Sequence, residues 1–179
     1  MSFFQEGYQV PASGGNGQYT KLEQGKNVIR ILSAPVMGFE YWNTDNKPVL
    51  SKEKFEGVPS GARLDDKGNF KQKHFWAMKV YNYATEQVEI MQITQKNIQN
   101  AIVEYAQSED YGDPREYDIT ITRKGEGLET QYTVMPSPPK PLKPEVVKAS
   151  NDTQVNLNAL FTGDNPFEAD AFDEAEVEL

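Results

Sequence analysis

The chain has 179 residues, a net charge of -9, no cysteine and one histidine, His74. These counts exclude disulfides and thiolate metal sites, and one imidazole is too few for a zinc site, so we expect no metal and no other cofactor. The length fits one hydrophobic core with appendages. No apolar run approaches the roughly 20 residues of a membrane span, and the first residues lack a leader pattern, so we expect a cytoplasmic protein without a membrane partner.

The acidic residues are concentrated at one end of the chain. Residues 164–179 contain seven acids and no base, which leaves 18 bases against 20 acids before residue 164. Residues 47–79 contain eight bases and four acids, so the centre of the chain is locally basic. Because bases neutralise phosphates in nucleic-acid complexes, this distribution answers the objection that an acidic chain should not bind nucleic acid.

Several strands are predicted between a flexible start and residue 135. The glycine-rich run at residues 13–17 predicts a flexible N-terminal arm over residues 1–18. Segments rich in β-branched and aromatic residues predict the strands. These strands cover residues 26–32, 38–42, 74–83, 87–93, 117–123 and 129–135. Residues 43–70 form a long polar connection between the second and third of them.

One helix interrupts the strands. Apolar residues recur three and four positions apart from Ile98 to Ala106, which predicts a helix with Thr94 as its N-cap. Strands, hairpin, helix and second hairpin in this order are typical of a small barrel. We therefore predict a mainly β fold over residues 19–135, an OB-like five-stranded barrel with one inserted helix.

Two further segments follow the predicted barrel. Residues 136–163 begin with a proline cluster that cannot continue a sheet, so we expect an extended strap and then short helices near residues 145–149 and 155–161. Residues 164–179 have too few apolar groups to fold alone, which predicts a disordered acidic tail.

The predicted strand at residues 74–83 carries the most informative pattern, because strand side chains alternate between two faces. Aromatic rings interleaved with lysine on one face are suited to stacking on unpaired bases while the ammonium groups contact phosphates. The residues expected to contact nucleic acid are Tyr41, Trp42, Lys71, Lys73, Phe75, Lys79, Tyr81, Tyr83 and Arg123. The alternative is that these rings belong to the core, and the sequence does not decide which face points inward.

Other patterns are weaker. Adjacent acids such as Asp65 and Asp66 are typical of solvated loops, and Gly125 with Gly127 is typical of a hairpin turn and not of a phosphate loop. No nucleophile stands in a pattern with a base, so we expect no enzymatic activity.

Six short segments resemble, in pattern and order, phage single-stranded-DNA-binding replication proteins. They are residues 18–23, 29–32, 39–42, 74–77, 93–96 and 117–121. This resemblance implies an OB-fold, a groove of aromatic and basic residues, no catalysis, and action in the cytoplasm of the host cell. Without cysteines the chain would fall in a zinc-free branch.

The resemblance also implies a role for the acidic tail. It would recruit a polymerase, a helicase or primase, or a recombination protein. Charge complementarity further predicts that the tail carboxylates cover the basic groove when DNA is absent. The tail residues expected to take part are Asp164, Phe167, Asp170, Phe172, Asp173 and Glu174. A plain solubility tail is the alternative.

The sequence therefore predicts a non-specific single-stranded-DNA-binding protein of phage replication or recombination, a monomer or weak homo-oligomer. The competing hypothesis is an acidic interaction protein, either a DNA mimic or a phage structural adaptor. A mimic should be acidic over its folded face, whereas here most of the net charge lies at one end.

Overall fold

The structure is a computed structural model that describes residues 18–167. Within this range seven antiparallel strands form one sheet. The strands are β1 (Gly25–Ile31), β2 (Val36–Trp42), β3 (Pro48–Ser51), β4 (Lys73–Asn82), β5 (Gln87–Ile93), β6 (Asp118–Lys124) and β7 (Gln131–Pro136). The helices are α1 (Lys96–Gln107), α2 (Pro144–Asp152) and α3 (Ala159–Thr162), with single 3-10 turns η1 (Pro114–Glu116) and η2 (Gly127–Glu129). Every strand expected from the sequence is present, and β3 is an addition within the polar connection.

The sheet is open, so the prediction of a closed five-stranded barrel is not confirmed. The strands follow the order β3-β2-β4-β1-β6-β7, and β5 pairs with the other edge of β4. Within residues 18–167 no pairing joins β5 to β7. Instead α1 lies beside β7, where the Asn97 amide donates to the carbonyl of Tyr132 at 2.9 Å and the Tyr105 hydroxyl donates to that of Val134 at 3.0 Å. Helix side chains thus satisfy the β7 edge that a barrel would pair with a strand.

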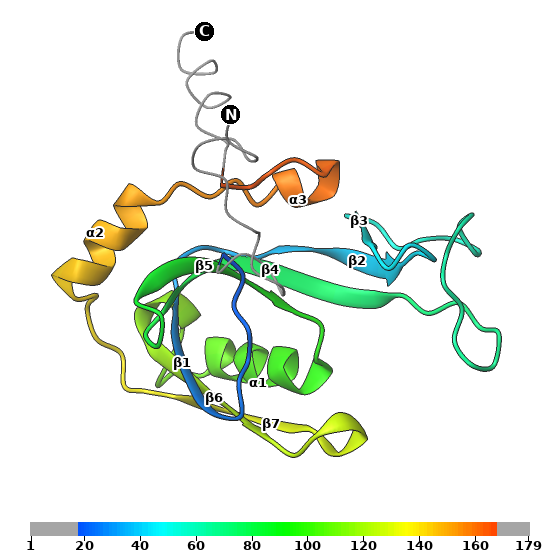
Figure 1. Ribbon diagram of the computed structural model, residues 1–179. Coiled ribbons are helices and arrows are strands. Elements are labelled where there is room, and N and C mark those ends of the chain that lie inside the picture. The colour runs from blue at the N-terminus through cyan, green and yellow to red at the C-terminus, as the bar shows by residue number, and fades with distance from the viewer. Residues whose placement is uncertain (1–17, 168–179) are drawn as a thin grey trace, which may run out of the picture.

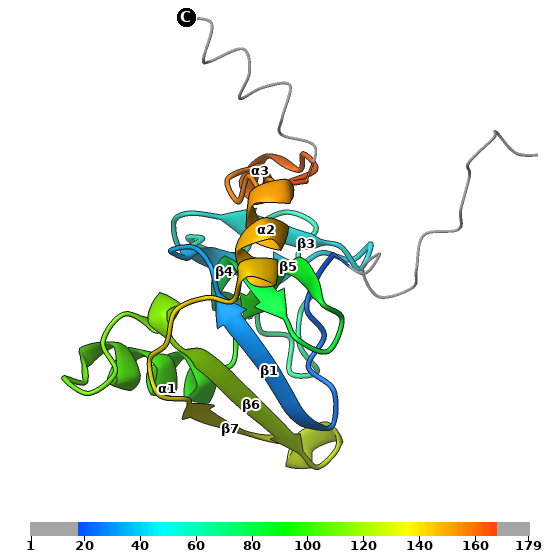
Figure 2. The same cartoon turned by 90° about the vertical axis from the view of Figure 1, so that its left-hand side faces the viewer.

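Strand β4 is the centre of the molecule because both of its faces are buried. Trp76, Met78 and Val80 point to one side and pack with α1, each at most 9% exposed. Phe75 and Tyr81 point to the other side, toward the segment with α2 and α3, and are 0% and 6% exposed. Figure 1 and Figure 2 show β4 between α1 on one side and α2 with α3 on the other.

Helix α1 has the predicted period but a different start. Ile98 and Ile102 are buried against the sheet, as their spacing predicts. The N-cap is Gln95 and not Thr94, and no side chain bonds to the free amides of the first turn. No described helix is long and apolar enough to cross a membrane.

The C-terminal segment is fastened to the sheet by an aromatic contact over a glycine. Phe161 of α3 lies on Phe75, with ring centroids 5.8 Å apart. Gly38 of β2 makes room for this contact, since a Cβ there would lie 2.2 Å from the Ser51 carbonyl oxygen and about 3 Å from both rings. The expected short helices are therefore packed parts of the fold.

A buried ion pair ties the same segment to the strands. Arg30 of β1 and Asp118 of β6 are 2% and 6% exposed, with Nη1 and Oδ1 3.4 Å apart. The Arg30 guanidinium also donates to the carbonyls of Arg115 and Lys140, each at 2.8 Å. The other Asp118 oxygen lies 3.1 Å from Nζ of Lys140, and the Tyr83 hydroxyl donates to Oδ1 at 2.8 Å. Two strands, η1 and the proline-rich strap meet at these groups.

Removing one partner of this pair should be costly. We expect Asp118→Ala to lower the free energy of unfolding by ~3–5 kcal/mol, because it leaves a buried guanidinium without its counter-charge. Urea denaturation measures the loss. Asp152→Ala, which removes the same group from an exposed pair with Lys148, is the control and should change stability little. Equal losses in the two variants would contradict the role given to Asp118.

Candidate nucleic-acid interface

The aromatic face expected to bind bases is covered in the structure. Phe75, Tyr81 and Tyr41 are 0%, 6% and 7% exposed, so the prediction that their rings are open for stacking is wrong. The physical reason is that β4, which carries Phe75 and Tyr81, is buried on both faces, while Phe55 and Phe70 cover Tyr41 of β2. The hypothesis that these aromatics belong to the core accounts for all three.

Three further predicted contact residues are engaged within the fold. Lys79 donates from Nζ to the Ser150 carbonyl at 2.8 Å, and burial lowers the pKa of its ammonium. Burial and the hydrogen bond to Asp118 raise the pKa of the Tyr83 hydroxyl. Arg123 is half-buried and donates from Nη1 to the Leu22 carbonyl at 2.9 Å. Each of these three side chains therefore already bonds to a group within the fold.

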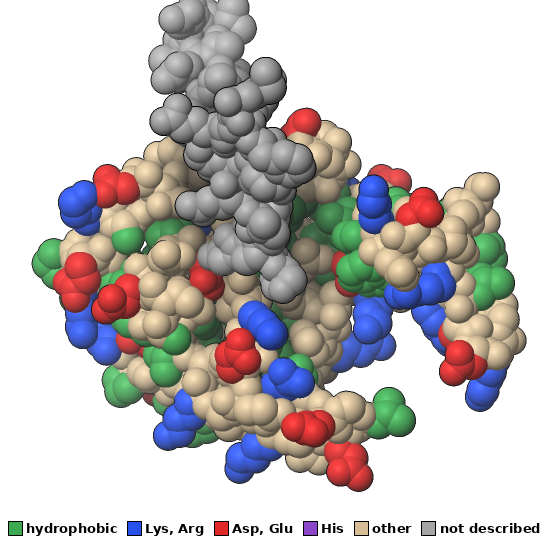
Figure 3. Space-filling model, in the orientation of Figure 1, with side chains coloured by type: hydrophobic (Ala, Val, Ile, Leu, Met, Phe, Trp, Pro, Cys, Tyr) green, Lys and Arg blue, Asp and Glu red, His purple; other side chains and the backbone are tan. Residues whose placement is uncertain are grey.

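The remaining predicted residues, Trp42, Lys71 and Lys73, lie on a projecting lobe. We call residues 42–73 the basic arm; it contains β3 and the long connection that follows. Seven bases and five acids belong to it, whereas the rest of residues 18–167 has 11 bases and 15 acids. All seven bases of the arm are exposed: Lys47, Lys52, Lys54, Arg63, Lys67, Lys71 and Lys73. In Figure 3 blue side chains gather on this lobe, next to a hollow between it and the rest of the body.

The arm is held in shape by its own small core. The buried Tyr41 ring packs edge to face on Phe55 and Phe70, with centroids 4.8 Å and 5.4 Å away. The amide of Gln72 donates to the Phe55 carbonyl at 2.8 Å and accepts from the Phe55 N–H at 2.9 Å. Asp65 accepts from two backbone N–H groups of its loop at 2.8 and 2.9 Å. The polar connection predicted for residues 43–70 is thus an ordered element that presents its bases at fixed places.

Trp42 gives the arm an exposed aromatic surface. Its side chain is among the exposed large hydrophobics, at 42%. The Arg63 guanidinium lies 5.9 Å from the indole centre and donates from Nη1 to the Asn46 side chain at 2.7 Å. An indole with a positioned guanidinium beside it combines a stacking surface with a charge for phosphate.

Two lysines share a face with Trp42. Lys73 lies opposite Glu40 in the β2–β4 register, and Trp42 is two residues from Glu40, so all three point to the same side of the sheet. Lys52 reaches that side as well, since its Nζ lies 5.5 Å from the centre of the Phe161 ring. Charge and aromatic surface therefore alternate across this face.

Glu40 lies beneath these cations. It is 7% exposed, and Oε2 accepts from the Gln92 amide at 2.8 Å. Burial raises the pKa of its carboxyl, while Lys73 and the bond from Gln92 act in the opposite direction. A carboxylate in this position offsets part of the positive charge of the arm.

His74 and Phe39 are a cross-strand pair of β4 and β2 and lie on the opposite face of the sheet from Lys73. Their rings lie 5.1 Å apart, and His74 Nδ1 lies 2.8 Å from the Gly38 carbonyl oxygen. Since a carbonyl only accepts, Nδ1 carries the proton and Nε2 points elsewhere. His74 is exposed, so Nε2 is open to solvent.

Several arm residues were counted in the basic segment but not singled out as contacts. Arg63 and Lys52 are the clearest cases, because their aromatic neighbours Trp42 and Phe161 are distant in sequence. Only the excess of bases over acids in this stretch signalled them.

The first residues of the predicted acidic tail belong to the fold. The Pro166 carbonyl accepts from the Asn156 N–H at 2.8 Å, and Phe167 packs edge to face on Tyr19 at 6.4 Å. The Asp164 carboxylate accepts from the Thr162 hydroxyl at 2.8 Å. The other predicted tail contacts lie outside the described residues: Asp170, Phe172, Asp173 and Glu174.

Across residues 18–167 no three metal-ligating side chains come together. The chain was also compared with protein-family models, characterised proteins and solved structures, and none of them matches it.

The raised pKa of Glu40 predicts a pH effect on stability. When the pKa of a carboxyl is higher in the folded state than in the unfolded state, the protein loses stability as the pH rises from the unfolded pKa, ~4.3, through the folded pKa. Glu40→Gln keeps the shape and removes this loss, so we expect its melting temperature to exceed that of the natural protein at pH 7 and to approach it near pH 4. Thermal unfolding at both pH values measures the difference. Glu56→Gln, at an exposed arm glutamate, is the control; a gain for Glu40→Gln that is the same at both pH values would contradict the assignment.

Proposed function

We propose that this protein binds single-stranded nucleic acid, and specifically DNA, without sequence preference, through the basic arm. The observation that carries the proposal is the joint exposure of Trp42, with Arg63 beside it, and seven arm bases on an ordered lobe. Stacking on an aromatic ring tolerates any base, and ammonium groups contact a backbone that every sequence shares. Such a surface favours non-specific binding of an unpaired strand.

The strand would lie on the face shared by Trp42, Lys73 and Lys52. Cross-strand pairing places Lys73 opposite Glu40, two residues before Trp42 on the same face, so a base on the indole brings its phosphates toward Lys73. Single-stranded-binding proteins combine a charged track with such stacking positions. The choice of DNA over RNA rests on the resemblance to phage replication proteins, since stacking and phosphate contacts suit either nucleic acid.

Binding should depend on Trp42 and Lys73 in different ways. We expect Trp42→Ala to weaken binding of labelled oligo-dT by ~1–3 kcal/mol, about fivefold to a hundredfold, through loss of stacking. We expect Lys73→Ala to reduce the salt dependence, since each neutralised phosphate contributes a log-log slope of roughly -0.7 for single strands. Fluorescence anisotropy at several salt concentrations gives both quantities.

Two controls make this titration decisive. Lys143→Ala removes an exposed charge from the start of α2, away from the arm, and should leave the affinity close to that of the natural protein. Trp42→Phe keeps a ring and leaves Trp76 as the remaining tryptophan, so binding should persist while most of the quenching of tryptophan emission disappears. Absence of oligo-dT binding at low salt would refute the proposal. Equal losses of affinity for Lys143→Ala and Lys73→Ala would show that binding does not use the arm.

The acidic end should oppose binding. A protein ending at Phe167 lacks six acids, which leaves 21 acids against 18 bases and a net charge of -3. We expect it to bind oligo-dT more tightly than the full chain at low salt, with a difference that shrinks as salt screens the charges. Equal affinities at low salt would show that the terminal acids do not compete for the arm. The described contacts of Asp164 and Phe167 are the reason to stop there and not at residue 163.

A further inference from the structure

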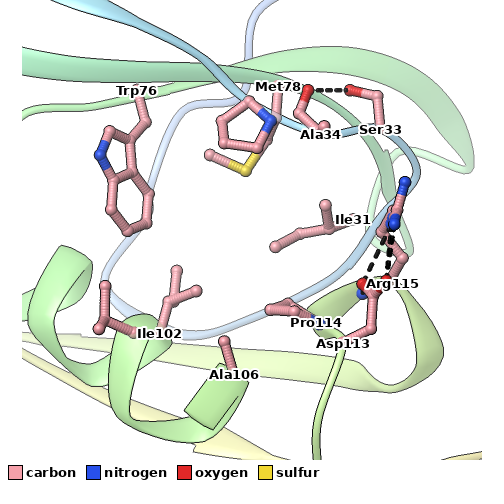
Figure 4. A pocket seen from close by; sticks show the side chains of 12 residues that line it. Ile31, Ser33, Ala34, Trp76, Met78, Ile102, Ala106, Asp113, Pro114 and Arg115 are labelled. Atoms are coloured by element: carbon pink, nitrogen blue, oxygen red, sulfur yellow. Dashed lines mark hydrogen bonds and ion pairs between the residues drawn. The ribbon is translucent and has the colours of Figure 1, made fainter.

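An apolar pocket of about 320 Å³ opens on the face of the sheet that carries α1. It lies between the end of β1, β4, α1 and the turn before β6, as Figure 4 shows. Its apolar walls are Ile31, Trp76, Met78, Ile102, Ala106 and Pro114. Val103 also lines it and is 39% exposed, and Met37, across the β2–β4 ladder from Trp76, is 48% exposed. Apolar surface therefore continues outward from the opening.

The chemistry of the pocket selects an apolar occupant. Its polar groups are few: the Ser33 hydroxyl donates to the Ala34 carbonyl at 3.0 Å, and at the margin Arg115 pairs with Asp113 through Nε and Nη2. A nucleobase buried here would leave its polar edge without partners, which costs free energy. An aliphatic side chain meets no such cost, and the volume lies at the lower end of the range of ligand pockets.

Leu128 is an aliphatic side chain presented for such a contact. It lies at the tip of the β6–β7 hairpin and is 107% exposed. Backbone bonds from Glu129 N–H to Glu126 at 3.1 Å and from Thr130 N–H to Gly127 at 3.3 Å fix the turn. Gly125, at φ +82°, closes it, since a Cβ there would lie 2.4 Å from the Glu129 carbonyl oxygen. The leucine is thus held in place outside the body.

The leucine and the pocket lie at opposite ends of β6. Pro114 and Arg115 line the pocket just before β6 begins, and Leu128 follows its end. Seven strand residues at roughly 3.3 Å each separate the two by about 20 Å or more, so one copy cannot fill its own pocket. Figure 2 shows α1 and the β6–β7 turn well apart.

Charge also matches between the two ends. Leu128 stands between Glu126 and Glu129, both exposed. At the pocket margin the exposed Arg115 uses Nε and Nη2 on Asp113, which leaves Nη1 without a partner among the described residues. Glu126 and Glu129 of a second copy stand beside its Leu128. When that leucine enters the pocket, one of these carboxylates can accept a hydrogen bond from Nη1 of Arg115.

We propose that Leu128 of one copy inserts into the apolar pocket of the next, so that identical copies associate head to tail. The contact is heterologous, because a projection meets a pocket on a different part of the surface, and it leaves one projection and one pocket open at the ends of every chain of copies. Copies bound along one strand would thereby favour their neighbours. The contact itself does not depend on DNA binding.

Complementation between two variants tests this arrangement. Leu128→Glu removes the projection and keeps the pocket, and Ala106→Glu obstructs the pocket and keeps the projection. Sedimentation velocity without DNA should show concentration-dependent association of the natural protein up to about 1 mM and, for each variant alone, association at least about tenfold weaker. An equal mixture of the two variants should recover a dimer and nothing larger. Val147→Glu, at an exposed valine of α2, should associate like the natural protein.

Several results would overturn the head-to-tail contact. They are a natural protein that stays monomeric, a mixture that gives no dimer, and self-association of Leu128→Glu equal to that of the natural protein. If Ala106→Glu weakens self-association and Leu128→Glu does not, the pocket binds a segment other than Leu128, which also overturns the proposal. An oligo-dT short enough to bind a single copy should bind Leu128→Glu as tightly as it binds the natural protein. This measurement therefore tests DNA binding independently of self-association.

Discussion

The burial of β4 on both faces is the constraint on which the rest of the structure depends. Trp76 and Met78 require α1 on one side, and Phe75 requires α3 on the other. The strand also holds the sheet together, because β2, β1 and β5 all pair with it. A segment more than 60 residues farther along the chain therefore completes the core around it, and the strap and the short helices follow from that need.

This constraint decides where the protein can present aromatic surface. The rings of Phe75, Trp76 and Tyr81 on β4 are buried in the core. The ends of β2 and β4 extend past that cover, and there the same alternation leaves Trp42 and Lys73 outside while Tyr41 anchors the arm. The division between core and exposed surface thus occurs along one pair of strands, within a few residues.

The local pattern of the sequence was sufficient to predict most helices and strands, but not which of them pack against one another. Alternation and the spacing of Ile98 and Ile102 predicted the strands and α1, because period depends on neighbours in sequence. Which face of β4 was free could not be predicted, since Phe75 is covered by Phe161 and no local pattern links them. The open sheet was missed for a similar reason: the β7 edge is satisfied by side chains of α1, and strand spacing alone does not distinguish this from a closing strand.

The candidate site was predictable in charge and not in geometry. An excess of bases in the middle of the chain marked the arm correctly as the basic region. Its order was hidden, because Tyr41, Phe55 and Phe70 are too few and too widely spaced to show a period, although together they form a small core. Arg63 beside Trp42 has no sequence signal at all, since a cation and a ring about 20 residues apart meet only when the loop folds back.

Separation of the arm from the main core gives substitutions on it a simple meaning. The bases of the arm are exposed, and Trp42 lies outside the clusters that bury β4, so removing these side chains creates no cavity in the core. A change in binding then reports on the surface and not on unfolding. Glu40 is the exception, since it is buried and lies beside Lys73, and a substitution there changes stability and local charge together. The proposed interface and the fold therefore meet at this carboxyl.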